Sequence, residues 1–137
     1  VSVCFKDVKK SNSWEEAYDK ISDKYGEYGH CRIYQEIGML INTLKFAKNV
    51  GHGICIQVSQ GADTDSFGAT SGSLLGAYFG PGFLEDSWVK PFNDDIHTGL
   101  AWFFERSVSK LAKRMANLPK IVSKGKFNNN GIPFKYF

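Results

Sequence analysis

The residues best suited to chemistry are two aspartates and a serine within the run Gly61-Ala62-Asp63-Thr64-Asp65-Ser66. Together they place two carboxylates and a hydroxyl within four residues, and such hard oxygen ligands are those that Mg²⁺ and Ca²⁺ prefer. The following residues, 67–77, are mostly Gly, Ala, Ser and Thr, which let neighbouring backbone or a ligand approach closely. The pattern predicts a cation site beside a tightly packed segment.

The same residues have a second interpretation, as the start of a helix. Aspartate and serine are preferred N-terminal capping types, and Asp65 and Ser66 lie where the next predicted helix begins. On the residue types alone, capping explains them as well as metal binding does. The residue types alone leave both interpretations open.

The whole run from Gly61 to Ala77 closely resembles the second metal-binding motif of the ADP-ribosylglycohydrolase family. The resemblance extends over residues 12–116. Further similar segments are Trp14-Glu15-Glu16, Lys24-Tyr25, Gly29-His30, the apolar run to Phe46, Gly80-Pro81, Trp88, residues 91–96 and residues 111–114. Two departures stand out: Tyr34 occupies a position where family members often carry Asn, and the family's first metal motif and catalytic Glu have no equivalent in this sequence.

The resemblance implies an all-α, orthogonal multi-helix bundle, of which this chain is the C-terminal portion. It implies that Asp63, Asp65 and Ser66 bind a pair of Mg²⁺ ions, that Asp65 is catalytic, and that His30 and Gly61 contact substrate. The remaining ligands would come from an N-terminal half, on the same polypeptide or on a partner. The implied activity is hydrolysis of a glycosidic bond to ADP-ribose in a modified protein or a related compound. A lone histidine is more often structural, so His30 keeps that alternative.

Length and composition predict one globular domain. The chain has 137 residues, 42% hydrophobic and 23% charged, which is near the globular average. It contains no apolar run of 18 residues and no signal-like leader, and its three widely spaced cysteines fit a reducing cytoplasm. A first residue other than Met indicates a cleaved or truncated product. We therefore expect a cytoplasmic protein without a membrane partner.

Helical periodicity covers most of the chain. Ser13 and Glu16 form a capping box ahead of a helix to Tyr25, and a second apolar stripe runs from Ile33 to Leu44. Residues 46–58 are predicted as a helix, although 54–58 could be a strand. Further helices are predicted over 65–78, with Ala69, Gly72, Ser73 and Gly76 on the packed face, over 85–89, and from Asn93 or Asp94 to Pro119. The expected division is an N-terminal segment (1–11), the family domain (12–118) and a basic polar tail (119–137).

Asn93-Asp94-Asp95 imitates the absent first metal motif, but its position favours a helix cap. Charge is uneven, because residues 1–105 carry 14 acidic and 9 basic side chains whereas residues 106–137 carry 8 basic side chains and no acidic one. Two other functions remain open. One is a non-catalytic nucleotide-binding or structural member of the same fold family. The other, ranked last, is nucleic-acid binding through residues 106–137.

Overall fold

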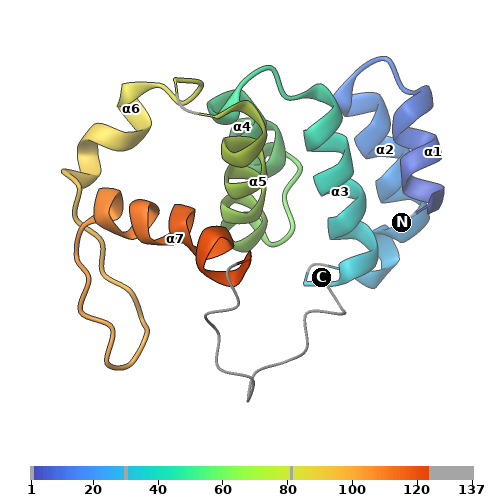
Figure 1. The fold of residues 1–137 in the computed structure, drawn as a ribbon. Helices are drawn as coiled ribbons and strands as arrows, with labels where there is room; N and C mark the ends of the chain where they lie inside the picture. The colour runs from blue at the N-terminus through green and yellow to red at the C-terminus, as the bar shows by residue number, and fades with distance from the viewer. Residues whose placement is uncertain (1, 30, 81, 124–137) are drawn as a thin grey trace. The chain divides into compact units, whose positions relative to one another are not determined.

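The computed structural model describes residues 2–29, 31–80 and 82–123, and every regular element in them is a helix (Figure 1). The elements are α1 (Ser2–Lys10), α2 (Trp14–Tyr25), η1 (Gly26–Tyr28), α3 (Ile33–Phe46), α4 (Val50–Ser59), α5 (Thr64–Phe79), α6 (Asp86–Val89), η2 (Lys90–Phe92) and α7 (Val108–Ser123). The predicted all-α class is confirmed. The chain forms two compact units that divide after Trp88.

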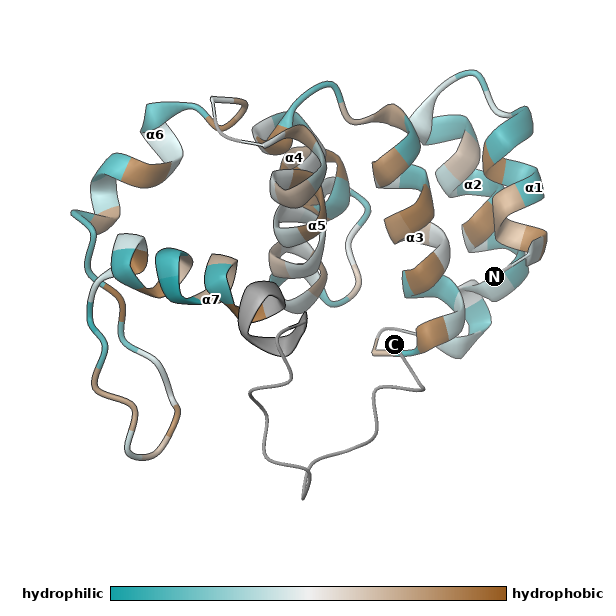
Figure 2. Ribbon diagram, viewed as in Figure 1, coloured by the Kyte–Doolittle hydropathy of each residue, from teal (hydrophilic) through white to brown (hydrophobic). Residues whose placement is uncertain are grey.

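The first unit is built around α1, α2 and α3. Val8, Ala17, Ile21 and Met39 form its buried apolar centre. Figure 2 shows apolar residues recurring along α3, as the sequence pattern predicts. The ammonium group of Lys45 on α3 donates to the carbonyl oxygens of Val8 at 2.7 Å and of Ser11 at 2.6 Å. These bonds satisfy carbonyls at the end of α1, which a helix by itself leaves unpaired.

The start of α2 follows the predicted capping box with one difference. The backbone N–H of Glu16 donates to the hydroxyl of Ser13 at 3.2 Å, as expected. The carboxylate of Glu16 accepts from the N–H of Asn12 at 2.9 Å, one residue earlier than in the usual reciprocal pair. The box therefore fixes both the helix start and the residue before it.

Residues 50–59 form a helix, so helix instead of strand is confirmed for 54–58, but the predicted start at Phe46 is wrong because residues 47–49 separate α4 from α3. Asn49 caps it by accepting the N–H of His52 at 2.7 Å. Helix α4 packs closely on α5 at Gly53, because a Cβ there would lie 2.1 Å from Leu75 Cδ1. The predicted packed face of α5 is wrong by about one position. Its buried residues are Gly68, Ser71 and Leu75.

The second unit, from Val89 onward, corrects the prediction of a helix starting at Asn93 or Asp94. Both residues have left-handed backbone, with φ values of 46° and 58°, which ends η2 and cannot continue a right-handed helix. Residues 95–107 form a loop closed by a bridge between Asp95 and Ser107, and α7 begins only at Val108. Helix α7 also continues past Pro119 to Ser123, so Pro119 does not end it.

Asp94 nevertheless caps a helix, as the sequence suggested, but across the loop. Its carboxylate accepts the Ser109 N–H at 2.7 Å and the Ser107 hydroxyl at 2.6 Å. The loop is further held by Arg106, which donates to both carboxylate oxygens of Asp95 at 3.0 and 2.7 Å. Of the predicted basic tail, residues 124–137 lie outside the described residues.

Candidate functional site

A buried polar network fixes the end of α4, directly before the acidic run. The side-chain amide of Gln60 donates to the Thr43 hydroxyl at 2.9 Å and to the Met39 carbonyl at 3.2 Å. Its carbonyl oxygen accepts from Asn42 Nδ2 at 2.8 Å. Gln60 is 2% exposed and Asn42 and Thr43 are 0% exposed. Buried amides with these partners hold one geometry, so α3 positions the residues that follow Gln60.

The turn after Gln60 has an uncommon backbone. Gly61 and Ala62 have φ values of +80° and +62°. This left-handed region suits glycine but is uncommon for alanine, so the turn is held by its surroundings. The turn delivers Asp63 to the N-cap position of α5, directly before Thr64.

Asp63 occupies the N-cap position of α5 without capping it. Its side chain makes no capping hydrogen bond to the helix. A carboxylate at this position usually accepts a backbone N–H of the first turn. The Asp63 carboxylate is therefore left for another role.

Asp65 and Ser66 lie in the first turn of α5, and both are exposed. A hydrogen bond from the Asp63 carboxyl, together with the backbone N–H groups of Asp65 and Ser66, holds the pKa of the Asp65 carboxyl below its ordinary value. Further along α5, Thr70 and Ser73 bond back to carbonyls four residues earlier. Among the described residues no group is hydrogen-bonded to the Ser66 hydroxyl. The structure thus brings Asp63 and Asp65 together and leaves the neighbouring hydroxyl available.

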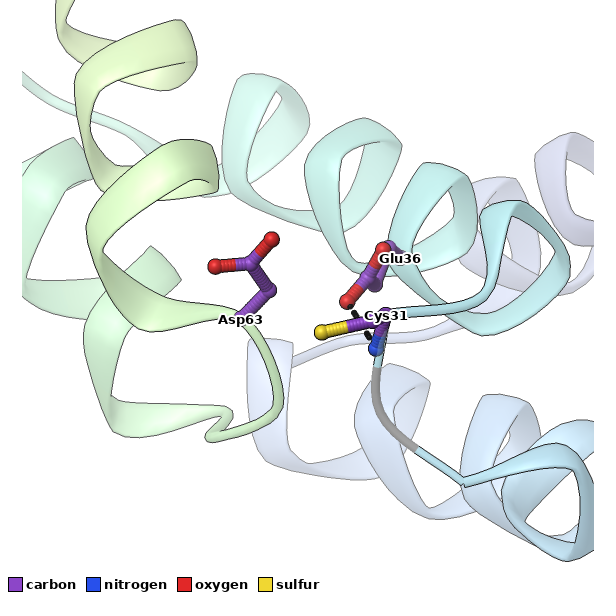
Figure 3. Close-up of side chains that lie close together, drawn as sticks. All are labelled: Cys31, Glu36 and Asp63. Carbon is purple, nitrogen blue, oxygen red and sulfur yellow. Dashed lines mark hydrogen bonds between the residues drawn. The ribbon is translucent and has the colours of Figure 1, made fainter.

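Two residues that the sequence interpretation did not select approach Asp63. The Sγ of Cys31, a carboxylate oxygen of Glu36 and one of Asp63 all lie within 4.8 Å of one another (Figure 3). Glu36, on α3, is 4% exposed and accepts the backbone N–H of Cys31 at 2.8 Å. The sequence did contain a signal for Glu36. This residue lies four positions before Leu40, so on a helix its carboxylate lies on the same, buried side of α3 as Leu40.

A polar pocket of about 420 Å³ adjoins the acidic run. Its lining includes Gln35, Gln60, Gly61 and Ala62, the last two being the residues directly before Asp63. The volume is in the range of small-molecule sites, and the polar lining suits a ligand with hydroxyl or phosphate groups. The other predicted substrate contact, His30, lies outside the described residues.

The sequence profile of the ADP-ribosylglycohydrolase family matches residues 2–120. The chain belongs to the ADP-ribosylglycohydrolase family. This membership supports hydrolysis of ADP-ribose linkages as the activity of the family. Neither a curated protein nor a solved structure matches the chain significantly. Within residues 2–29, 31–80 and 82–123, no helix combines the length and hydrophobicity of a bilayer span.

Proposed function

We propose that this ADP-ribosylglycohydrolase chain supplies the second metal-binding motif of a Mg²⁺-dependent hydrolase that removes ADP-ribose from a modified protein or a related compound. The observation that supports the proposal most is the geometry of Asp63, which occupies the N-cap position of α5, two residues before Asp65, and makes no capping hydrogen bond. An N-cap aspartate that served only the helix would accept a backbone N–H of the first turn, and Asp63 accepts none.

The donor chemistry of these residues fits Mg²⁺. Asp63 and Asp65 offer carboxylate oxygens and Ser66 offers a hydroxyl, and Mg²⁺ binds such hard oxygen ligands while keeping several waters. Two neighbouring carboxylates also repel each other when both are ionised, and a divalent cation removes that repulsion. We therefore propose Asp63, Asp65 and Ser66 as ligands, with the remaining ligands from an N-terminal half of the same protein.

Within the reaction, Asp65 is proposed to hold the attacking water and accept its proton. An aspartate carboxyl is ionised at neutral pH, as a base requires, and the lowered pKa of Asp65 favours the ionised form that a metal ligand needs. Bound Mg²⁺ would supply electrostatic stabilisation of the charge that develops as the glycosidic bond breaks. Gly61, and His30 by resemblance, are proposed to line the substrate side. The acid that assists the leaving group is not among the residues of this chain identified with the family motif.

The deciding experiment compares wild type, Asp65→Asn and the exposed control Asp23→Asn in the complete polypeptide that carries these residues. We expect Asp65→Asn to lose Mg²⁺-dependent release of ADP-ribose while its thermal unfolding midpoint stays that of wild type, since Asn keeps the size and hydrogen-bonding reach of Asp at this exposed position. Asp23→Asn should retain turnover. Wild-type turnover with unchanged Mg²⁺ dependence in Asp65→Asn would overturn the proposed metal site. The 137-residue chain alone is expected to bind Mg²⁺ weakly and to release no ADP-ribose.

A second candidate, a non-catalytic nucleotide-binding or structural member of the family, is favoured by one observation. Residues 1–62 contain no hydroxyl residue followed by two aspartates, the form of the family's first metal motif. Such a member would bind ADP-ribose by calorimetry without turnover in the complete polypeptide. For both candidate functions we propose a cytoplasmic location, because the three cysteines are free thiols. Nucleic acid remains the least favoured partner.

A further inference from the structure

We infer that Cys31, Glu36 and Asp63 form a binding site for a thiophilic divalent cation such as Zn²⁺. The site shares Asp63 with the proposed Mg²⁺ site, so its consequence for catalysis rests on the proposed function. The binding itself depends only on side chains within the first compact unit.

The three ligands come from separate parts of that unit. Cys31 precedes α3, Glu36 lies in the first turn of α3, and Asp63 begins α5. Figure 3 shows the thiol of Cys31 and the carboxylates of Glu36 and Asp63 pointing toward a common space. One sulfur and two oxygens lie there within 4.8 Å of one another. Tetrahedral Zn²⁺, with bonds of about 2.0–2.3 Å, needs ligand separations of roughly 3.3–3.8 Å, so the side chains need to close by at most about 1–1.5 Å.

Glu36 gives an independent indication of a cation. It is 96% buried, since its exposed fraction is 4%. Among the described residues, no Lys or Arg side chain pairs with it, and its hydrogen-bond partner is the backbone N–H of Cys31 inside the cluster. Burying a carboxylate without a compensating cation is costly, and a second carboxylate beside it adds repulsion. A bound divalent cation offsets both costs.

The thiol of Cys31 determines which type of cation the site prefers. Cys31 is exposed and free, so its sulfur is accessible from solvent. Thiolate ligands favour Zn²⁺ and other soft or borderline cations, whereas Mg²⁺ requires octahedral oxygen ligands. Three protein ligands leave a fourth position for water or substrate. Because Asp63 belongs to both sites, Zn²⁺ held here withdraws a ligand from Mg²⁺, and we expect Zn²⁺ to inhibit Mg²⁺-dependent turnover.

The test titrates the full chain with Cd²⁺, whose bond to a thiolate gives an ultraviolet charge-transfer absorption. The variants are Cys31→Ser and Cys55→Ser, which removes the other exposed cysteine and serves as the matched control. We expect wild type and Cys55→Ser to show saturable absorption and Cys31→Ser to lose it. Absorption that persists in Cys31→Ser would overturn the site.

Glu36→Gln and Asp63→Asn test the carboxylates. Each should weaken Cd²⁺ binding by at least about tenfold, as loss of a single support for a metal ligand already does. Because Glu36→Gln could weaken binding only by disturbing the fold at a buried position, Asp63→Asn tests the carboxylates at a less buried one. If Cd²⁺ binds both variants as tightly as wild type, the cation is held by the exposed thiol alone and the proposed three-ligand site is wrong. In the complete polypeptide, Zn²⁺ should suppress Mg²⁺-dependent turnover in Cys55→Ser and not in Cys31→Ser. If the complete polypeptide lacks turnover altogether, the hydrolase proposal fails while the Cd²⁺ titration still decides the thiophilic site.

Discussion

The side-chain amide of Gln60 donates to the hydroxyl of Thr43 over 2.9 Å, although the two residues are 17 positions apart in sequence. The bond is buried and connects the end of α4 to the middle of α3. Gln60 is followed at once by the turn that carries Asp63, so this interior contact determines where the acidic run begins. The candidate site thus depends on residues with no chemistry of their own.

Gln60→Leu should lower the free energy of unfolding by about 1–3 kcal/mol, because it keeps the approximate volume but removes the buried bonds to the Asn42 amide, the Thr43 hydroxyl and the Met39 carbonyl. Denaturant unfolding of the variant measures the change. Ser59→Ala, at the exposed neighbouring position, should stay within about 0.5 kcal/mol of wild type. Equal stability of Gln60→Leu and wild type would show that the network does not hold this turn.

Glycine 53 should be intolerant of even a methyl group. A Cβ at Gly53 would lie 2.1 Å from Leu75 Cδ1 and 3.0 Å from Ala47 Cβ, and Leu75 is only 2% exposed. We expect Gly53→Ala to destabilise by about 1–3 kcal/mol through overpacking, although alanine favours helix. Thermal unfolding is the measurement.

The matched substitution is Gly76→Ala on the partner helix α5. No heavy atom lies within 4 Å of a Cβ at Gly76. Helix propensity should therefore dominate there and stabilise the protein by up to about 1 kcal/mol. A Gly53→Ala protein as stable as Gly76→Ala would contradict the close packing of α4 on α5.

The cap of α7 should weaken at low pH. Hydrogen bonds from the Ser107 hydroxyl and the Ser109 N–H hold the pKa of Asp94 below its ordinary value of 3.8. A carboxyl whose folded pKa is lowered contributes stability that is present above the unfolded pKa and is lost as pH falls through the folded one. Amide exchange of the first turn of α7 should therefore accelerate below about pH 3.8.

Asp94→Ala should show the accelerated exchange already at neutral pH and should lose its dependence on acid. Asp86→Ala, in the short helix α6, provides a comparison that removes an aspartate outside this cap. Protection of the first turn of α7 that is the same in Asp94→Ala and wild type would show that the loop, and not this carboxylate, fixes the start of α7.

The sequence by itself determined the helical class, most helix positions and the acidic run. Helix periodicity and caps such as Ser13 act within one or two turns, so a linear pattern contains them completely. The all-α class and the family followed from such local patterns, and α2, α3, α5 and α6 lie where periodicity placed them.

The tertiary structure alone decided which residues distant in sequence contact one another. Asp94 caps a helix that begins 14 positions later, at Val108. Left-handed backbone at Asn93 and Asp94 turns the chain into a loop, and at its end the Val108 N–H donates to the Asp94 carbonyl oxygen. Gly53 marks a close contact between α4 and α5, since packing against Leu75 outweighs the low helix propensity of glycine. Glu36 meets Asp63 for the same reason: residues distant in sequence become neighbours only when buried faces pack, and the identity of those neighbours is a property of the packed chain.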